Sequence, residues 1–287
     1  MAKKNKKSDK LYAVIGLGRF GFALAEELAA KGCDVIVVCL GGSSSRFAGG
    51  GEFDSNGAMK AQSAITMDCG ENVDDYLLEL PGRQKELLWA LRSVGKPVIA
   101  VLIAGRPYAM GEIDADAIVQ AFYPGLTGGE AIAKLLFGDI EPAGRLCVTL
   151  PDHVGQLPVA YNARDSYRYC AYYRGERPRY QFGDGLSYTR FRYAVRSGDR
   201  EAVTVGITNI GARPGWAVPQ LYLHRTQGVV TSRTQLCAFD KRWIAPGETV
   251  EVKLPIPEEA LMQFDWSMRQ RLVPGRVEWV LRDCGET

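Results

Sequence analysis

The chain has 287 residues, of which 46% are hydrophobic and 24% are charged, and its formal net charge is +2. This length allows two ordinary domains with a sizeable core, while the even charge balance gives no overall reason to expect a nucleic-acid or membrane-surface partner. The seven cysteines form no C-x-x-C pair, and the only histidines are His153 and His224. We therefore expect no metal site, no cofactor and no Ser-His triad.

The first ten residues are basic through five lysines and are predicted to form a disordered tail. The apolar run that follows, Leu11–Leu17, is interrupted by Gly16 and is too short for a secretory signal. No stretch approaches the length of a membrane span. These features predict a cytoplasmic protein.

Residues 11–40 read as strand, helix and strand. Gly16, Gly18 and Gly21 stand at the turn from the first strand to the helix, where glycines let a dinucleotide pyrophosphate approach the helix N-terminus. The acidic residue that would end the second strand and hold a ribose hydroxyl is absent, since Val38–Leu40 occupies that place. A β-α-β packing unit that binds no nucleotide is the alternative.

The opening Leu11-Tyr-Ala-Val-Ile-Gly-Leu-Gly-Arg-Phe-Gly21 is followed by a Glu-Glu-Leu helix. Over residues 11–38 it resembles the Rossmann regulatory domains of bacterial potassium-uptake systems. That resemblance implies a nucleotide-sensing role for this segment.

Residues 41–72 are rich in glycine, serine and acidic side chains and show little periodicity, which suits a loop that binds a polar ligand or a merely flexible one. Near its end, Glu71, Asp74 and Asp75 form an acidic cluster before a predicted helix. Carboxylates on a loop above an α/β scaffold suit acid–base chemistry. The alternative is that they only favour the helix dipole.

That helix is predicted to begin after Pro81 and to end at Gly95, with an apolar stripe on one face. A buried strand over Val98–Ile103, a strand over 117–123 and a helix over 130–137 follow. Right-handed crossovers between such elements predict an α/β fold with a mostly parallel sheet flanked by helices. Ligands of such folds gather at the carboxyl ends of the strands.

Residues 138–192 are rich in loops and include a Tyr/Arg-rich patch over 161–180, which suits a domain contact or a sugar-stacking surface. From about residue 197 the apolar pattern has a period of two, interrupted by turns, which predicts an antiparallel β-sandwich. The predicted organisation is a tail over 1–10, an α/β domain over 11–192 and a β-sandwich over 193–287.

A series of motifs runs in order through most of the chain: Asp68-Cys-Gly-Glu-Asn-Val-Asp74, Leu80-Pro-Gly-Arg-Gln84, Gly105-Arg-Pro107, Tyr123-Pro-Gly125, Pro142-Ala-Gly-Arg-Leu146, Gly155-Gln-Leu-Pro158 and Phe182-Gly-Asp-Gly-Leu-Ser-Tyr188. From about residue 33 onward this pattern resembles the C-terminal half of glycoside hydrolase family 3, the β-glucosidase and β-xylosidase family. The last part resembles the fibronectin type III-like domain of that family.

In that family a (β/α)8 barrel supplies a catalytic Asp nucleophile, and the α/β sandwich domain supplies the general acid/base. The resemblance implies the acid/base role for Glu71, with Glu52 as a second candidate. It also implies substrate contacts for Arg46, Asp68 and Asp74. The family usually has glycine where Asn72 stands, so the motif is not a complete match.

The barrel has no counterpart, because the residues before position 34 cannot hold eight β-α units. Retaining hydrolysis needs two carboxylates about 5 Å apart. We therefore expect the chain to hydrolyse a β-linked glucoside or xyloside only with a barrel from another polypeptide, and to contain a junction near residue 33. A nucleotide-binding regulatory module and a non-catalytic carbohydrate-binding or scaffold protein remain as other hypotheses.

Overall fold

The computed structural model describes residues 12–15, 34–44, 55–56, 68–70, 73–163, 177–225, 234–272 and 276–282. The chain divides into two compact units. The first comprises Met1–Glu130 with Asp152–Val154, and the second comprises Ala131–Pro151 with Gly155–Thr287. The predicted domain boundary between residues 192 and 193 stays a prediction.

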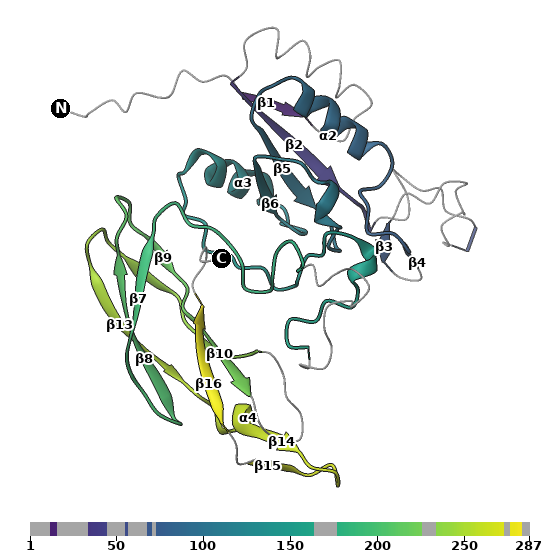
Figure 1. The fold of residues 1–287 in the computed structure, drawn as a ribbon. Coiled ribbons are helices and arrows are strands. Elements are labelled where there is room, and N and C mark those ends of the chain that lie inside the picture. The colour runs from purple at the N-terminus through teal and green to yellow at the C-terminus, as the bar shows by residue number, and fades with distance from the viewer. Residues whose placement is uncertain are drawn as a thin grey trace, which may run out of the picture. The chain divides into compact units, whose positions relative to one another are not determined.

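A four-stranded sheet forms the centre of the first unit (Figure 1), and its neighbouring strands all pair in parallel, in the order β1-β2-β5-β6. This confirms the predicted parallel sheet. The strands are β1 (Tyr12–Ile15), β2 (Val35–Gly41), β5 (Val98–Ile103) and β6 (Ala117–Gln120). β6 is shorter than the strand predicted over 117–123, and β2 extends into the segment expected to be loop.

One face of this sheet is closed to solvent along β2 and β5. In a parallel pair the side chains of register partners point to the same face. The six residues of that face are fully buried: Ile36, Val38, Leu40, Val98, Ala100 and Leu102. Runs of Val, Ile and Leu are typical of parallel strands that are buried on both faces.

Helices are few among the described residues. α2 (Gln84–Ser93) fits the predicted apolar stripe, because Leu88 and Leu91 are fully buried. The chain then turns at Gly95, whose φ of +75° is a left-handed conformation that glycine adopts without strain. The other α-helices are α3 (Gly128–Phe137) and α4 (Glu258–Leu261). Short elements are β3 (Cys69–Gly70), β4 (Val73–Asp74), η1 (Met110–Glu112) and η2 (Val154–Gln156).

The second unit contains antiparallel strands arranged as β13-β8-β7, β11-β10-β16, β12-β9 and β14-β15. They are β7 (Phe191–Gly198), β8 (Ala202–Asn209), β9 (Gly215–Ala217), β10 (Gln220–Arg225), β11 (Gln235–Phe239), β12 (Arg242–Ile244), β13 (Thr249–Pro255), β14 (Met262–Phe264), β15 (Gln270–Leu272) and β16 (Val277–Arg282).

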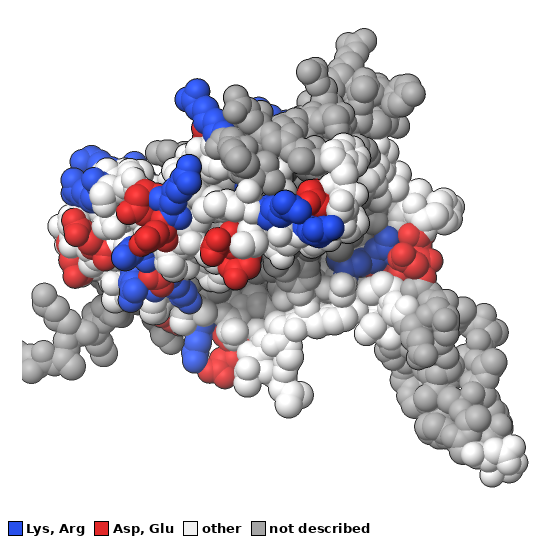
Figure 2. Space-filling model, turned by 90° about the horizontal axis from the view of Figure 1, so that it is seen from below, with Lys and Arg blue, Asp and Glu red and all other residues white. Residues whose placement is uncertain are grey.

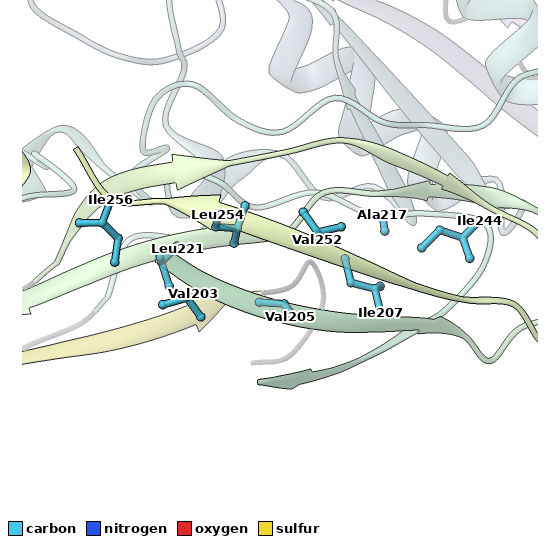
Figure 3. Packing of buried hydrophobic residues seen from close by; sticks show 9 residues of the cluster. All are labelled: Val203, Val205, Ile207, Ala217, Leu221, Ile244, Val252, Leu254 and Ile256. Carbon is cyan, nitrogen blue, oxygen red and sulfur yellow. The ribbon is translucent and has the colours of Figure 1, made fainter. Parts of the chain in front are cut away.

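The core of this unit is built from alternate residues of several strands, as the period of two predicts (Figure 3). Val203, Val205 and Ile207 of β8 point to the same side as Val252 and Leu254 of β13. Side chains of β9, β10 and β12 and one residue just after β13 complete the cluster: Ala217, Leu221, Ile244 and Ile256.

Two of the sequence motifs fasten a loop-rich segment within the second unit. The Leu146 N–H donates to the Asp184 carbonyl, and the Gly183 N–H donates to the Leu146 carbonyl. The Glu141 carboxylate accepts hydrogen bonds from the Ser187 hydroxyl and from the Tyr188 backbone N–H. These contacts give the motifs around residues 142–146 and 182–188 a structural role.

On the face shown in Figure 2, basic and acidic side chains are interspersed, in keeping with the net charge of +2. Within the described parts of the chain, no helix combines the length and the apolar character needed to cross a bilayer.

Candidate functional site

The carboxyl ends of β2 and β5 meet at one edge of the parallel sheet, where ligands of α/β folds usually bind. The chain leaves β2 at Gly41, whose φ is +139°, and a Cβ there would lie 1.9 Å from the Ile103 carbonyl oxygen. Only glycine therefore fits this position. Just beyond it, the Asp68 N–H donates to the Ser43 carbonyl at 3.1 Å, which brings Asp68 to the same edge.

Asp68 is an acidic residue in an enclosed position, only 8% exposed. Its Oδ2 accepts a hydrogen bond from the Tyr108 hydroxyl, whereas its Oδ1 is buried and has no hydrogen-bond partner among the described residues. A Cβ on Gly42 would lie 2.0 Å from the carboxylate, so the backbone of Gly42 packs directly against it. Burial, followed by the hydrogen bond to Asp68, raises the pKa of Tyr108 well above its usual value.

Arg106 lies just after β5, and both terminal nitrogens of its guanidinium bind the chain around β3 and β4. Nη1 donates to the Asp68 carbonyl at 3.1 Å and to Asp74 Oδ1 at 2.6 Å. Nη2 donates to the carbonyls of Asp75 and Leu77, each at 3.2 Å. The Arg106 side chain is 12% exposed. One buried cation thus holds the chain before β3 and the chain at and after β4.

Gln84, the first residue of α2, fastens that helix to the end of β2. Its side-chain Nε2 donates to the Gly41 carbonyl, and its Oε1 accepts from the Gly41 N–H, both at 2.7 Å. The amide therefore pairs with the last residue of β2 as a neighbouring strand would. This contact fixes the start of α2 at the same edge.

The chain after β6 reaches this edge too. Phe122 has a φ of 51°, an uncommon conformation for a bulky residue, and its carbonyl accepts the Ala104 N–H at 3.2 Å. Tyr123 is 48% exposed. A Cβ on Gly105 would lie 2.8 Å from the Tyr123 ring and 3.2 Å from Cys69 Sγ. An exposed aromatic side chain suits a ligand that has both apolar faces and hydroxyl groups, such as a sugar.

The predicted site residues fall partly within the structure. Asp68 and Asp74 are joined through Arg106, but they differ in exposure, because the Asp74 side chain is 82% exposed. Their predicted role in substrate binding stays a prediction. The remaining candidates lie outside the described residues: Gly16, Gly18, Gly21, Arg46, Glu52 and Glu71.

Sequence reasoning missed Arg106, Tyr108 and Gln84. The motif Gly105-Arg-Pro107 entered the sequence analysis only as part of a resemblance. Its position directly after a buried strand could have identified Arg106, because ligands of α/β folds bind at the carboxyl ends of the strands. Within the described ranges, no group of three or more His, Cys, Asp or Glu side chains is arranged to hold a metal ion.

Comparisons with known proteins agree with this architecture. The profile of the glycosyl hydrolase family 3 C-terminal domain matches residues 22–188, and that of the fibronectin type III-like domain matches residues 217–281. The chain therefore belongs to glycosyl hydrolase family 3, of which it carries the C-terminal domain followed by a fibronectin type III-like region. The family match begins at residue 22, earlier than the start expected near residue 33.

Among curated relatives, a periplasmic β-glucosidase of Salmonella typhimurium is 34% identical over 273 residues, which cover 86% of this chain and 32% of the relative. A β-xylosidase of Formosa agariphila is 31% identical over 265 residues, covering 86% of this chain and 36% of the relative. The chain thus spans about a third of the length of these relatives.

Solved structures give the same result. A β-glucosidase of Erythrobacter marinus matches 92% of this chain and 35% of its own, with a TM-score of 0.74 and 34% identity. A β-glucosidase of Listeria innocua, solved in complex with glucose, matches 95% of this chain and 39% of its own, with a TM-score of 0.73 and 25% identity. The resemblance of residues 11–38 to potassium-uptake regulatory domains gains no support from these comparisons and stays a prediction.

Proposed function

We propose that this chain is the acid/base-bearing part of a family 3 glycosidase of the β-glucosidase or β-xylosidase type. Glu71 is the proposed general acid/base, with Glu52 as the second candidate, and Arg46, Asp68 and Asp74 are the proposed substrate contacts. The chain hydrolyses a β-linked glucoside or xyloside only together with a barrel-bearing polypeptide that supplies the nucleophile. The proposal places it in the cytoplasm and requires no cofactor.

The observation that carries this proposal is the arrangement of Arg106. Its hydrogen bonds reach Asp68 on one side of position 71 and Asp74, Asp75 and Leu77 on the other. A group that protonates a leaving oxygen has to be within hydrogen-bond reach of it, and neighbouring residues keep it there. The carboxyl edge of the sheet is also where α/β folds bind their ligands.

The test is hydrolysis of aryl β-glucosides and β-xylosides by the purified chain, alone and mixed with the separately expressed barrel domain of a family 3 relative. We expect turnover only in the mixture. Glu71→Gln should then slow substrates with poor leaving groups far more than substrates with activated ones, because activated leaving groups need no protonation. Glu79→Gln, an exposed acid in the same segment, is the control.

Two results would contradict the proposal. Turnover by the chain alone would show that a nucleophile lies within it. A uniform loss across leaving groups in Glu71→Gln, together with a leaving-group dependence in Glu52→Gln, would transfer the acid/base role to Glu52. Fractionation of the native host cells checks the cytoplasmic location separately.

A nucleotide-binding module is the second candidate, and the parallel pairing of β1 with β2 favours it, because a β-α-β nucleotide site needs two such strands. Calorimetry with NADH and ATP tests it, with Gly18→Val as the variant expected to lose binding. No heat at millimolar ligand would exclude this function. Binding of gluco- or xylo-oligosaccharides without turnover, even when a barrel domain is added, would instead favour the carbohydrate-binding hypothesis. The exposed side chain of Tyr123 supports that hypothesis.

A further inference from the structure

A buried arginine ends β10 in the second unit. Leu221, Leu223 and Arg225 are alternate residues of one strand and therefore point to the same face. Leu221 belongs to the apolar core of the sandwich. Arg225 continues that inward-facing row and is only 5% exposed. An arginine at an inward position is unusual, because a buried charge costs free energy unless a partner compensates it.

The guanidinium of Arg225 has little compensation among the described residues. Nη2 donates to the Leu261 carbonyl at 2.8 Å, and no acidic side chain there forms an ion pair with it. Burial lowers the pKa of Arg225, but an arginine stays protonated in a folded protein. With a single neutral acceptor among the described residues, most of the five N–H donors have no hydrogen-bond partner there and the positive charge has no counter-charge there.

A small cavity lies beside Arg225. Its volume is about 40 Å³, and its walls are Leu223, Arg225, Gln235, Ala260, Met262 and Gln263. One water needs about 10–15 Å³ of such space, so the cavity has room for a group of about three heavy atoms. Three of its walls are apolar, and two are side-chain amides that can hydrogen-bond to an oxygen.

We propose that this cavity is a binding site for a small carboxylate, held by the guanidinium of Arg225. A carboxylate matches the planar arginine fork with two parallel hydrogen bonds and neutralises its charge. The cavity has room for the carboxylate group, which has three heavy atoms, and the rest of the ligand lies outside it. The carboxylate comes from a free organic acid or from an acidic sugar such as a uronate. This proposal concerns the second unit alone and does not depend on the glycosidase chemistry proposed for the first unit.

The test is the response of the full chain to acetate, propionate and glucuronate, with chloride and phosphate as comparison anions at constant ionic strength. Thermal unfolding and the NMR signal of the Arg225 Nε–H are followed in the same titrations. We expect a saturable rise of about 2–4 °C in melting temperature with a carboxylate, together with a saturable shift of the Nε–H signal. Acetate and glucuronate separate a simple acid from an acidic sugar.

Arg225→Met removes the charge and keeps a side chain of similar length. This variant should unfold at a temperature that carboxylates do not change. Arg282→Met is the matched control, because Arg282 lies in the same unit but already contacts the Tyr222 ring at 4.8 Å and Gln181 Oε1 at 3.3 Å. It should keep the carboxylate response. Should Arg225→Met fail to fold, the Nε–H titration of the unmodified chain decides alone.

Three results would overturn the proposal. They are an Nε–H signal that no carboxylate shifts up to about 50 mM, an equal response to chloride and phosphate, and a carboxylate response that survives in Arg225→Met.

Discussion

The two edges of the parallel sheet are each closed by an arginine and by aspartates, but in different ways. At the carboxyl edge, Arg106 is 12% exposed and binds three backbone carbonyls and one carboxylate. At the amino edge, Arg92 is 32% exposed and binds the carboxylates of Asp114 and Asp116 at 3.2 and 2.5 Å. Backbone carbonyls fix the path of the chain, whereas an exposed ion pair adds little.

This difference indicates that the backbone is held more firmly at the carboxyl edge of the sheet than at the amino edge. At the amino edge the Asp116 carboxylate also accepts the Val98 N–H at 2.7 Å, which serves the start of β5 and nothing beyond it. At the carboxyl edge the contacts converge on the chain before β3 and on the chain at and after β4. We therefore expect substitutions at the carboxyl edge to change both stability and the local order of residues 68–77, and substitutions at the amino edge to change neither by much.

The largest effect is expected for Arg106→Ala. It removes the donors for the carbonyls of Asp68, Asp75 and Leu77, and the loss should be about 3 kcal/mol of the free energy of unfolding. Chemical denaturation measures this loss. Hydrogen exchange of the amides at residues 68–77 should also accelerate more than exchange elsewhere in the sheet. Unchanged exchange in that segment would remove Arg106 from its assigned role.

Tyr108→Phe should have the second-largest effect. It leaves the buried Asp68 carboxylate without the hydrogen bond from the Tyr108 hydroxyl, at a cost of roughly 2 kcal/mol. The pKa of Tyr108 is raised in the folded state only, so its contribution is present below the unfolded value of about pH 10 and is lost as the pH rises toward the folded value.

The unmodified chain should therefore lose stability above about pH 10 more steeply than Tyr108→Phe does. Denaturation series at pH 8, 10 and 11 measure the two slopes. Other tyrosines titrate in both proteins and cancel in the difference. Equal slopes would mean that Tyr108 ionises normally in the folded chain, contrary to the enclosed position described above.

These contacts also show how far a sequence can predict such a fold. The strands and α2 follow from local patterns: the run Val98–Ile103 and the stripe with Leu88 and Leu91 are visible within ten residues. The contacts of the carboxyl edge join residues far apart in sequence, such as Gly41 with Gln84 and Asp68 with Arg106. No periodicity reports such pairs, because they depend on how the strands are ordered in the sheet.

The same reason explains what was misplaced at this edge. Gly41 was expected to open a polar loop, but it is the last residue of β2, because Gln84 satisfies both of its backbone groups. Asp68 and Asp74 were named together as substrate contacts on the basis of a resemblance. The structure gives them different surroundings, one buried against Tyr108 and one largely exposed.

Gln84→Ala should have a smaller effect, about 1 kcal/mol, because it removes two neutral hydrogen bonds that are only partly buried, one to the Gly41 N–H and one to the Gly41 carbonyl. Denaturation should show this loss, and exchange of the Gly41 amide should rise selectively. Gln84→Glu serves as the matched control: it keeps an acceptor for the Gly41 N–H but offers no donor to the carbonyl. We expect it to be at least as destabilised as the alanine variant, because its second carboxylate oxygen would face the Gly41 carbonyl oxygen.

The smallest effect is expected for Arg92→Ala at the amino edge. Its partners Asp114 and Asp116 are 64% and 48% exposed, so water and salt screen the ion pairs, and Asp116 keeps its hydrogen bond to the Val98 N–H. Melting temperature should change by no more than about 2 °C, and exchange at residues 68–77 should not change at all. If Arg92→Ala lost as much stability as Arg106→Ala, the difference in solvent exposure between the two arginines would not explain how much each contributes to stability. The rigidity would then belong to the sheet as a whole, and Arg106 would give no special reason to place the chemistry at its carboxyl end.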